Sequence, residues 1–374
     1  MAESVAPVRV ETRPVAAGGA IGVLTLNNPK ALNALSLDMI RILQPRLDAW
    51  RQDQSIRAVF LQGEGERAFC AGGDIVQLYR AMTDPASKPE DGDVFFTEEY
   101  RLDYTIHRYP KPLIVWGNGI VMGGGLGLMA GASHRIVTEN TTLAMPEVSI
   151  GLFPDVGATW FLNRMPDGVG LFLGLTGARC NASDARFIGL ADACLPANLR
   201  DTVLEGLTRI TYTDPESDRG RITQMLHSLE EAHPNQMPAS ELRRHLDLIR
   251  KVTGGASLSQ VVAALAQLPE SDPWLKHAHE NFFRGCPVTA HLVWRQLHGS
   301  RDLSLPDVFR RELIMAAQCL RHPDFAEGIR ARLIDKDQQP RWSFPRVEDV
   351  PESLVDEYFQ PPWPEGVHPL ADLK

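Results

Sequence analysis

The chain has 374 residues, of which 44% are hydrophobic and 23% charged, and its formal net charge is −9. This composition is typical of globular proteins, and the length suits one large domain with an appended region. The negative charge argues against a nucleic-acid partner, because a phosphate backbone requires a basic surface.

The sequence also indicates where the protein works. It has no apolar run of about 18 residues, and its first residues lack both the pattern of a signal peptide and the arginine-rich character of a transit peptide. The five cysteines are scattered without C-x-x-C spacing, which predicts reduced thiols and no metal site. We therefore expect a cytoplasmic protein that does not insert into a membrane.

Strand-like and helical segments alternate along the first half of the chain. The expected strands are 20–26, 57–62, 112–117, 136–137 and 142–144. The expected helices are 36–52, about 94–107, and one after each of Asp74 and Gly124. Ser36 is a suitable N-cap for the first of these helices. This β-then-α order predicts an α/β fold.

Beyond about residue 200 the strand-like runs disappear and helical periodicity takes over. We expect helices at 258–268, 289–297 and 308–320, and another that begins beside Pro323. The polar segment 83–93 contains proline and glycine and is expected to be a mobile loop. The chain is therefore divided into an N-terminal extension (1–17), a core (18–210) and a helical C-terminal region (211–374).

Two acids are unusual in the run 145–157. Glu147 and Asp155 lie eight residues apart, each follows a proline, and their neighbours are apolar or small. Ionised acids in such surroundings are costly unless they are hydrogen-bonded, and their pKa values shift towards those useful in acid–base catalysis. The plainer interpretation is a helix-start acid at 147 and a loop cap at 155.

Glu99 is a third unusual acid. It shares one face of the helix expected at 94–107 with Phe95, Leu102 and Ile106, at spacings i, i+4, i+7 and i+11. An acid within an apolar stripe needs a partner or a function, although a carboxyl that reaches out to solvent also fits the pattern. On this reading the neighbouring Glu98 faces solvent.

Two glycine-rich turns, at 68–75 and 117–127, each follow a strand-like run. Each predicts the start of a helix, where a ligand can approach unpaired backbone amides, and two such amides can bracket one oxyanion. The dinucleotide-binding fingerprint fails because Met122 occupies its third glycine position. Cys70 lies in the first turn without an evident histidine partner, so we interpret it as a structural thiol.

Together these residues resemble the crotonase (enoyl-CoA hydratase/isomerase) superfamily over about residues 18–210. Phe69–Asp74 and Asn118–Gly125 match its two oxyanion-hole motifs, and Asn27–Leu35 is similar to its coenzyme A-binding opening. The resemblance implies a crotonase-like spiral of repeated ββα units, with the helical C-terminal region covering the site. It implies Gly73 and Gly124 as oxyanion-hole donors. The residues implied to bind coenzyme A are Lys30, Ala31, Leu32, Ala71 and Asp74.

Segments 95–100, 145–157 and 333–342 are similar to one branch of this superfamily, the 3-hydroxyisobutyryl-CoA hydrolases. With this branch the resemblance spans nearly the whole chain. It implies hydrolysis of a short 3-hydroxyacyl-CoA in valine catabolism, with Glu99, Gly124, Glu147 and Asp155 binding the substrate. Beyond the coenzyme A of the substrate it implies no cofactor and no metal, and a homo-oligomer stays open.

The acids separate hydrolysis from hydration. The superfamily's hydratases carry one catalytic glutamate where this chain has Gly127 and another at the position of Glu147. Asp155 stands where hydratases tend to carry glycine, which favours a hydrolase with Glu147 and Asp155 as its catalytic residues. The alternatives are an enoyl-CoA hydratase or isomerase acting on another acyl-CoA, and a non-catalytic CoA-binding protein. The preferred acyl group, the division of roles between the two acids and the choice of base or nucleophile for Glu147 stay open.

Overall fold

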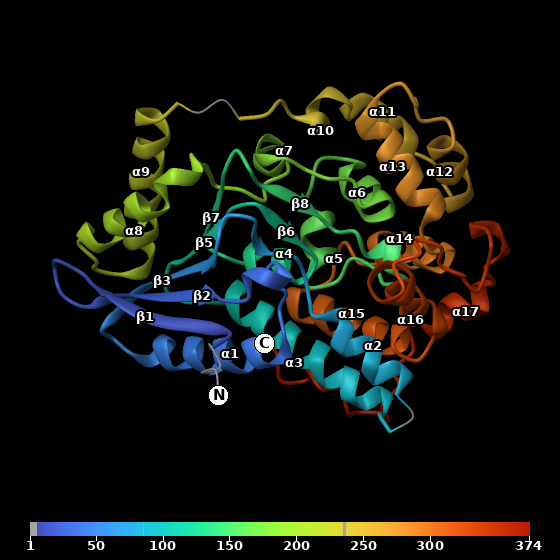
Figure 1. Ribbon diagram of the computed structural model, residues 1–374, viewed down its shortest axis with the longest axis horizontal. Helices are drawn as coiled ribbons and strands as arrows, with labels where there is room; N and C mark the ends of the chain where they lie inside the picture. Colours follow the sequence, from blue (N-terminus) through green and yellow to red (C-terminus); the bar gives the residue numbers. More distant parts are fainter. Residues whose placement is uncertain (1–5, 85, 235–236) are drawn as a thin grey trace. The chain divides into compact units, whose positions relative to one another are not determined.

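The computed structural model describes residues 6–84, 86–234 and 237–374 (Figure 1). Its contacts divide the chain into two compact units, each built from three separate segments. The first unit comprises Met1–Gly73, Leu102–Leu143 and Cys180–Glu241. The second unit comprises Asp74–Arg101, Ala144–Arg179 and Leu242–Lys374.

A six-stranded sheet with strand order β1-β2-β3-β5-β7-β9 forms the centre of the first unit. β1 pairs antiparallel with β2, and every later pair is parallel. β2 and β3 are buried almost throughout, as expected of parallel strands that helices cover on both faces. The strands are β1 (Val8–Pro14), β2 (Ala20–Leu26), β3 (Ile56–Gly63), β5 (Leu113–Gly117), β7 (His134–Val137) and β9 (Ala193–Cys194).

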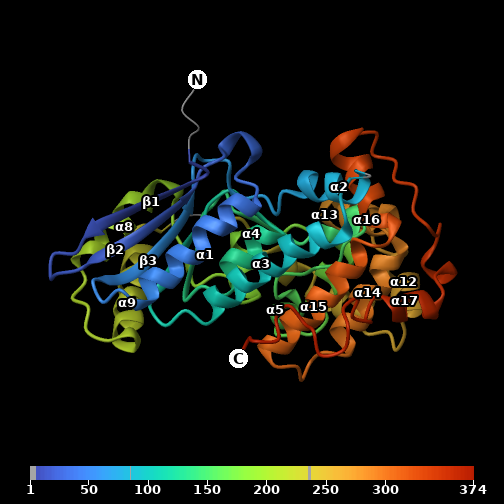
Figure 2. The same ribbon diagram turned by 90° about the horizontal axis from the view of Figure 1, so that it is seen from below.

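Helices cover both faces of this sheet (Figures 1 and 2). Side chains alternate along each strand, so Ile21 and Val23 pack with α8 and α9, whereas Leu24 lies with apolar residues of α1, α3 and α4. Ser36 caps α1 by accepting a hydrogen bond from the Met39 amide at 3.2 Å. The helices of this unit are α1 (Leu37–Gln52), the end of α3 (Pro89–His107), α4 (Gly124–Ala130), α7 (Ala182–Phe187), α8 (Arg200–Arg209) and α9 (Pro215–Ala232), with short 3-10 turns at Pro29–Ala31 and Ala197–Leu199.

A smaller sheet has the order β4-β6-β8, with β4 (Ala68–Cys70) parallel to β6 (Ile120–Met122) and β8 (Thr142–Ala144) at its end. The two glycine-rich turns follow β4 and β6. Because the carboxyl ends of neighbouring parallel strands lie at the same edge of a sheet, this pairing brings the two turns together.

The second unit is mainly helical. Every residue of α6 (Val169–Thr176) is buried, and α5, α11, α13 and α14 pack around it. This arrangement explains why α6 is apolar on all sides. The other helices are α2 (Ile75–Thr83), the first part of α3, α5 (Ala158–Leu162), α10 (Glu241–Arg244), α11 (Leu246–Thr253), α12 (Leu258–Leu265), α13 (Pro273–Arg284), α14 (Pro287–His298), α15 (Leu305–Cys319), α16 (Pro323–Ile329) and α17 (Glu352–Glu357), with 3-10 turns η2 (Glu147–Ile150) and Val347–Asp349 and a π-helical turn at Arg330–Ile334.

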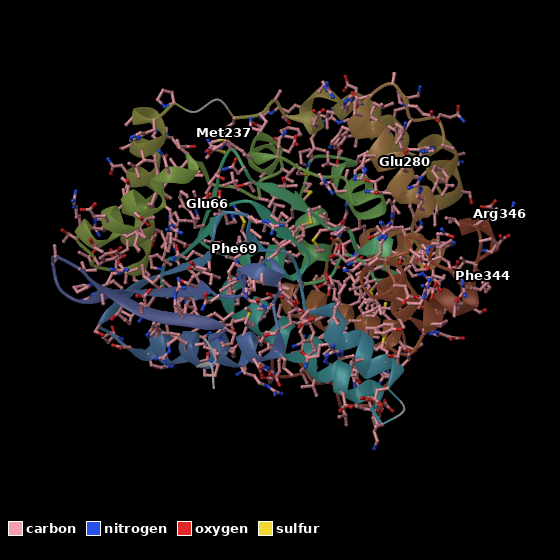
Figure 3. The ribbon with its side chains drawn as sticks, in the orientation of Figure 1. Glu66, Phe69, Met237, Glu280, Phe344 and Arg346 are labelled. Atoms are coloured by element: carbon pink, nitrogen blue, oxygen red, sulfur yellow. The ribbon has the colours of Figure 1, made fainter. Side chains whose placement is uncertain are left out.

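Most of the expected elements are confirmed within a few residues, including the helical character of the chain beyond residue 200. Trp342 and Phe344 (Phe344 is labelled in Figure 3) are half-buried, and the Trp342 indole donates to the Arg284 carbonyl at 3.0 Å. All five cysteines carry free thiols. In the part of the chain that the structure describes, no helix combines the length and the apolarity needed to cross a bilayer.

Two expectations differ from the structure. The segment 83–93 is not a loop throughout, because α3 begins at Pro89; the acids Glu90 and Asp91 lie in its first turn, where the helix dipole favours negative charge. Residue 85 of that segment lies outside the described residues. The extension 1–17 contains the edge strand β1, which the sequence does not predict because most of its residues are polar and exposed.

Candidate active site

Three carboxyl side chains gather inside the second unit. Glu99 lies on α3, Glu147 begins η2, and Asp155 lies in the turn before α5. Their exposed fractions are 2%, 5% and 4%. The structure therefore brings together the three acids that the sequence marked as unusual. The neighbouring Glu98 is half-buried, so it is less exposed than expected.

Close backbone packing fixes the turn that carries Glu147. η2 ends at Gly151, which has φ 74° and donates its amide to the Glu147 carbonyl. A Cβ atom at this glycine would lie 2.5 Å from the Asp324 carbonyl oxygen, so α16 can approach the turn only because the residue is glycine. Glu147 is thus presented from a rigid 3-10 turn.

Burial dominates the electrostatics of the three acids. It raises the pKa of Glu99 and of Glu147 well above the ordinary value, and the charge of Asp155 raises both further. Burial also raises the pKa of Asp155 to about 7, although a hydrogen bond from Tyr100 holds that pKa down. The cluster therefore keeps protons near neutral pH that isolated carboxyls would release.

One oxygen of each glutamate lacks a protein partner. Within the described residues, Glu99 Oε1 and Glu147 Oε2 are buried and make no hydrogen bond. Buried polar atoms are normally paired, so such atoms mark places where a substrate group or water can bind. In the same residues, no group of three or more His, Cys, Asp or Glu side chains is arranged to hold a metal ion.

Tyr100 was not singled out by sequence reasoning as a site residue. Its hydroxyl donates to Asp155 Oδ2 at 2.7 Å, and its side chain is fully buried. Burial and the Asp155 charge raise the pKa of Tyr100 well above its usual value, so it stays a donor. Its place next to Glu99 on α3 is the only local signal, because its partner lies 55 residues away.

In the first unit, the two glycine turns lie against each other. A Cβ atom on Gly72 would lie 4.0 Å from the Gly124 nitrogen, and one on Gly125 would lie 2.2 Å from the Cys70 carbonyl oxygen. Within the described residues, the amides of Gly73 and Gly124 donate to no protein acceptor. The structure therefore offers two unpaired donors from adjacent turns, the arrangement that an oxyanion hole requires.

The expected coenzyme A-binding turn lies in the same unit, where Asn33 stabilises it. The Asn33 side chain is fully buried; it donates to the carbonyls of Glu64 and Ala68 at 3.0 and 2.9 Å and accepts from the Asn28 amide at 2.9 Å. The Ala71 amide donates to the Leu32 carbonyl at 3.1 Å. Asn33 is thus a positioning residue that the sequence motif contained but our reasoning did not single out.

The remaining predicted coenzyme A contacts are placed as follows. Lys30 and Ala31 are exposed in the first unit, as a contact to an anionic ligand requires. Asp74 is the N-cap of α2 and accepts from the Gln77 amide at 3.4 Å. The predicted site residues thus fall into two groups: the acids and Asp74 in the second unit, and the others in the first.

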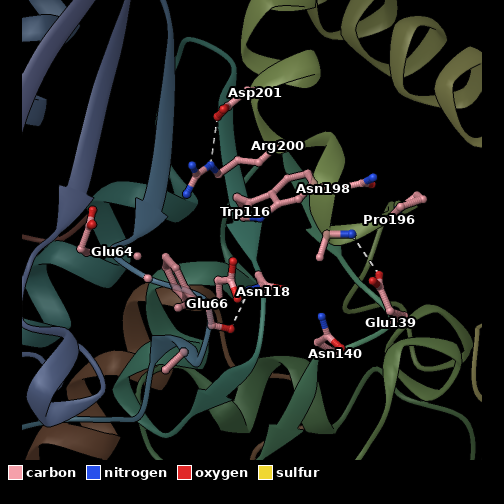
Figure 4. Close-up of a pocket in the computed structure, with 15 residues that line it drawn as sticks. Glu64, Glu66, Trp116, Asn118, Glu139, Asn140, Pro196, Asn198, Arg200 and Asp201 are labelled. Atoms are coloured by element: carbon pink, nitrogen blue, oxygen red, sulfur yellow. Dashed lines mark hydrogen bonds and ion pairs between the residues drawn. The ribbon is translucent and has the colours of Figure 1, made fainter.

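A cavity of about 760 Å³ opens in the first unit at the carboxyl ends of its parallel strands (Figure 4). Glu66 and Phe69, labelled in Figure 3, both line it. Its lining carries four carboxylates and one guanidinium, and that guanidinium, on Arg200, is paired with Asp201 at 3.2 Å. This charge does not suit the phosphates of coenzyme A, and none of the predicted site residues lines the cavity.

Comparison with known proteins gives the family. A family model described as enoyl-CoA hydratase/isomerase matches residues 21–359. The chain belongs to this family. The 3-hydroxyisobutyryl-CoA hydrolase, mitochondrial, of Gallus gallus is 38% identical over 92% of this chain and 87% of its own length. The 3-hydroxyisobutyryl-CoA hydrolase 1 of Arabidopsis thaliana is 37% identical over 91% of this chain and 89% of its own length.

Solved structures of the family share the fold. An enoyl-CoA hydratase from Rhodobacter sphaeroides matches with a TM-score of 0.81 and 32% identity, over 94% of this chain and 97% of that one. A carnitinyl-CoA dehydratase from Mycobacterium thermoresistibile matches with a TM-score of 0.80 and 35% identity, over 96% and 99%. The resemblance to the crotonase superfamily and the predicted fold class are confirmed.

Proposed function

We propose that this protein hydrolyses short 3-hydroxyacyl-CoA thioesters, with 3-hydroxyisobutyryl-CoA, an intermediate of valine catabolism, as the first candidate substrate. The observation that carries the proposal is the buried group of Glu99, Glu147 and Asp155, with an unpaired oxygen on each glutamate. The names of the Gallus gallus and Arabidopsis thaliana relatives support the same reaction.

The proposed reaction uses the acids and the amides differently. Ionised Glu147 takes a proton from water as the water oxygen bonds to the thioester carbonyl carbon. The carbonyl electron pair moves onto its oxygen, where the Gly73 and Gly124 amides each contribute about 3 kcal/mol of stabilisation. When the C–S bond breaks, the sulfur takes the proton from Glu147, giving the free acid and coenzyme A. Asp155 orients the water or the substrate hydroxyl, and Glu99 binds that hydroxyl.

A nucleophilic route uses the same residues. Glu147 attacks the carbonyl carbon and releases the coenzyme A thiolate, which takes a proton from solvent. Water then opens the resulting anhydride to the free acid and the Glu147 carboxylate and returns a proton to solvent. Incorporation of ¹⁸O into Glu147 during single-turnover hydrolysis in ¹⁸O-water would establish the nucleophilic route. The base route leaves Glu147 unlabelled, whereas water attack at the enzyme carboxyl of the anhydride labels it.

Hydration of an enoyl-CoA is the alternative, and the name of the structural relative from Rhodobacter sphaeroides, an enoyl-CoA hydratase, favours it. The second catalytic glutamate that hydration uses is absent from this chain, because Gly127 stands at its position. The deciding assay measures thiol release from 3-hydroxyisobutyryl-, 3-hydroxypropionyl-, acetyl- and crotonyl-CoA. We expect release from the two hydroxyacyl thioesters. Consumption of crotonyl-CoA without thiol release, together with inert hydroxyacyl thioesters, would contradict the proposal.

Three further expectations belong to this proposal. The reaction needs no resident cofactor or metal, so dialysis against a chelator should leave the rate unchanged. The protein acts in the cytoplasm; the vertebrate relatives are named mitochondrial, and fractionation of source cells tests the difference. It acts on acyl-CoA as a monomer or a homo-oligomer, which sedimentation distinguishes.

A further inference from the structure

α15 carries a carboxyl group on its buried face. Glu312 has no exposed surface, and the neighbouring Phe309, Leu313 and Ala316 are buried with it. Within the described residues it forms no ion pair with a cationic side chain. A buried carboxylate is costly unless hydrogen bonds compensate for its lost hydration, so its partners explain its presence.

Its two shortest partners are backbone amides of one turn, and the Gln296 side-chain amide also donates to Oε1, at 3.4 Å. Glu312 Oε2 accepts from the Gly157 amide at 2.6 Å, and Oε1 accepts from the Thr159 amide at 2.8 Å. Gly157 is the N-cap of α5 and has no side chain with which to cap the helix. Amides in the first turn of a helix lack intrahelical partners. Glu312 therefore caps the N-terminus of α5 from α15, in place of a side chain at the N-cap position itself.

Gln296 of α14 holds the other end of the same turn. Its fully buried amide donates to the Pro154 carbonyl and to Thr159 Oγ1, both at 2.7 Å. Asp155 lies between these fixed points. Side chains from two helices thus clamp the segment Pro154–Thr159, which we call the Asp155 turn.

The Asp155 turn has a backbone that needs such support. Val156 has φ 55° and is 1% exposed. A β-branched residue in this region costs about 1–3 kcal/mol and stays there only when surrounding contacts hold it. Val156 follows Asp155 directly in this turn, and the Asp155 carboxylate accepts from the Tyr100 hydroxyl at 2.7 Å.

We infer that Glu312, assisted by Gln296, is a positioning residue that holds Asp155 in its working orientation through the Asp155 turn. The kinetic part of this inference rests on the proposed function. Misplacement of a reacting group by about 1 Å costs roughly 10²-fold in rate. Glu312 thus affects the turnover rate only by positioning Asp155.

Glu312→Gln tests this directly, because glutamine has the same size but presents a donor to one of the two amides. We expect kcat to fall roughly 10- to 100-fold with KM changed by less than about 3-fold. Hydrogen exchange at the Gly157 and Thr159 amides should become faster. If this variant does not fold, Gln296→Met removes the donors on the other side and should lower kcat in the same way.

A double-mutant cycle separates positioning from general destabilisation. In an Asp155→Asn background, Glu312→Gln should change kcat by less than about 3-fold, because the residue it positions is already disabled. Asp218→Asn is the matched control: Asp218 is buried and accepts from the Thr213 amide at 2.8 Å, and its replacement should lower stability but not kcat.

Two results would overturn the inference: an unchanged kcat in Glu312→Gln, or effects that multiply fully with Asp155→Asn. Failure of the proposed function gives a different result, since the wild type then releases no thiol from any 3-hydroxyacyl-CoA. The amide exchange still decides in that case. Faster exchange at both amides supports the clamp, and unchanged exchange refutes it.

Discussion

Replacing Tyr100 with phenylalanine removes the hydroxyl that donates to Asp155 at 2.7 Å and keeps the ring in place. The Tyr100 hydrogen bond lowers the pKa of Asp155, which burial has raised to about 7. Without the hydroxyl, the folded-state pKa of Asp155 must rise. The ionised fraction at neutral pH then falls, and activity that depends on the Asp155 carboxylate falls with it.

The expected shift follows from the strength of the bond. A hydrogen bond to a charged group contributes about 1.5–3 kcal/mol, and one pKa unit corresponds to about 1.4 kcal/mol. The pKa of Asp155 should therefore rise by about 1–2 units. Starting from a pKa of about 7, the ionised fraction at pH 7 drops from about one half to roughly 1–10%. This is a loss of about 5- to 50-fold in rate.

The assay is the pH profile of kcat/KM for thiol release, measured from pH 5 to 10 with wild type and Tyr100→Phe. The titratable groups that interact with Asp155 are Glu99 and Tyr100 on α3, Glu147 on η2, and Glu312 and Cys319 on α15, so the acid limb reports the coupled titration of the carboxyls among them. We expect this limb to move up by 1–2 pH units and the two rates to converge near pH 10. The expected role of Tyr100 would be refuted if the acid limb of the variant lay at the wild-type pH. It would also be refuted if kcat/KM were lowered by the same factor at every pH.

Four other outcomes are expected. Glu147→Gln should lower kcat by roughly 10²–10⁴-fold in the thiol-release assay. Gly124→Pro removes one oxyanion donor and should lower kcat by about 10²–10³-fold, with circular dichroism to check folding. Glu99→Ala should slow turnover of 3-hydroxyacyl-CoA more than that of acetyl-CoA, and equal losses would show a structural role. Asp155→Asn should raise Tm at pH 8 but not at pH 4. The pKa of Asp155 is about 7 in the folded protein and near 3.8 in the unfolded chain. As the pH rises from the unfolded to the folded pKa, the wild type therefore loses up to about 4 kcal/mol of folding free energy that the asparagine variant keeps.

Sequence reasoning succeeded where the signal is local. Ser36 is the N-cap of α1 as the sequence predicts, because capping depends on residues within one turn. The apolar stripe around Glu99 marked this acid as unusual and left its burial open, and the structure buries it; helical periodicity fixes which side chains share a face. The proline-flanked acids Glu147 and Asp155 were recognisable because nothing near them in the chain is charged.

Reasoning of this kind failed where the structure depends on distant partners. β1 was overlooked because an edge strand can be polar on both faces, and only its pairing with β2 identifies it. The Tyr100–Asp155 bond joins residues 55 apart, and the Glu312–Gly157 bond joins residues 155 apart. No periodicity reports such distances. Glu312 did carry one usable signal, because it lies among apolar residues of a predicted helix, as Glu99 does.

Four of the buried carboxyls of the second unit, those of Glu99, Glu147, Asp155 and Glu312, illustrate how stability and function conflict. Burial raises the pKa of Glu312 to about 8, even though two amides and Thr159 favour its ionised form. Every one of these groups makes the folded state less stable as the pH rises through its folded pKa, because the unfolded chain ionises it more easily. A sequence selected for stability alone would replace them with apolar side chains. Here Glu312 binds the strained turn that carries Asp155, and Tyr100 donates a hydrogen bond to one Asp155 oxygen. Both buried groups therefore stabilise the orientation of Asp155, which is consistent with a functional role for that carboxylate.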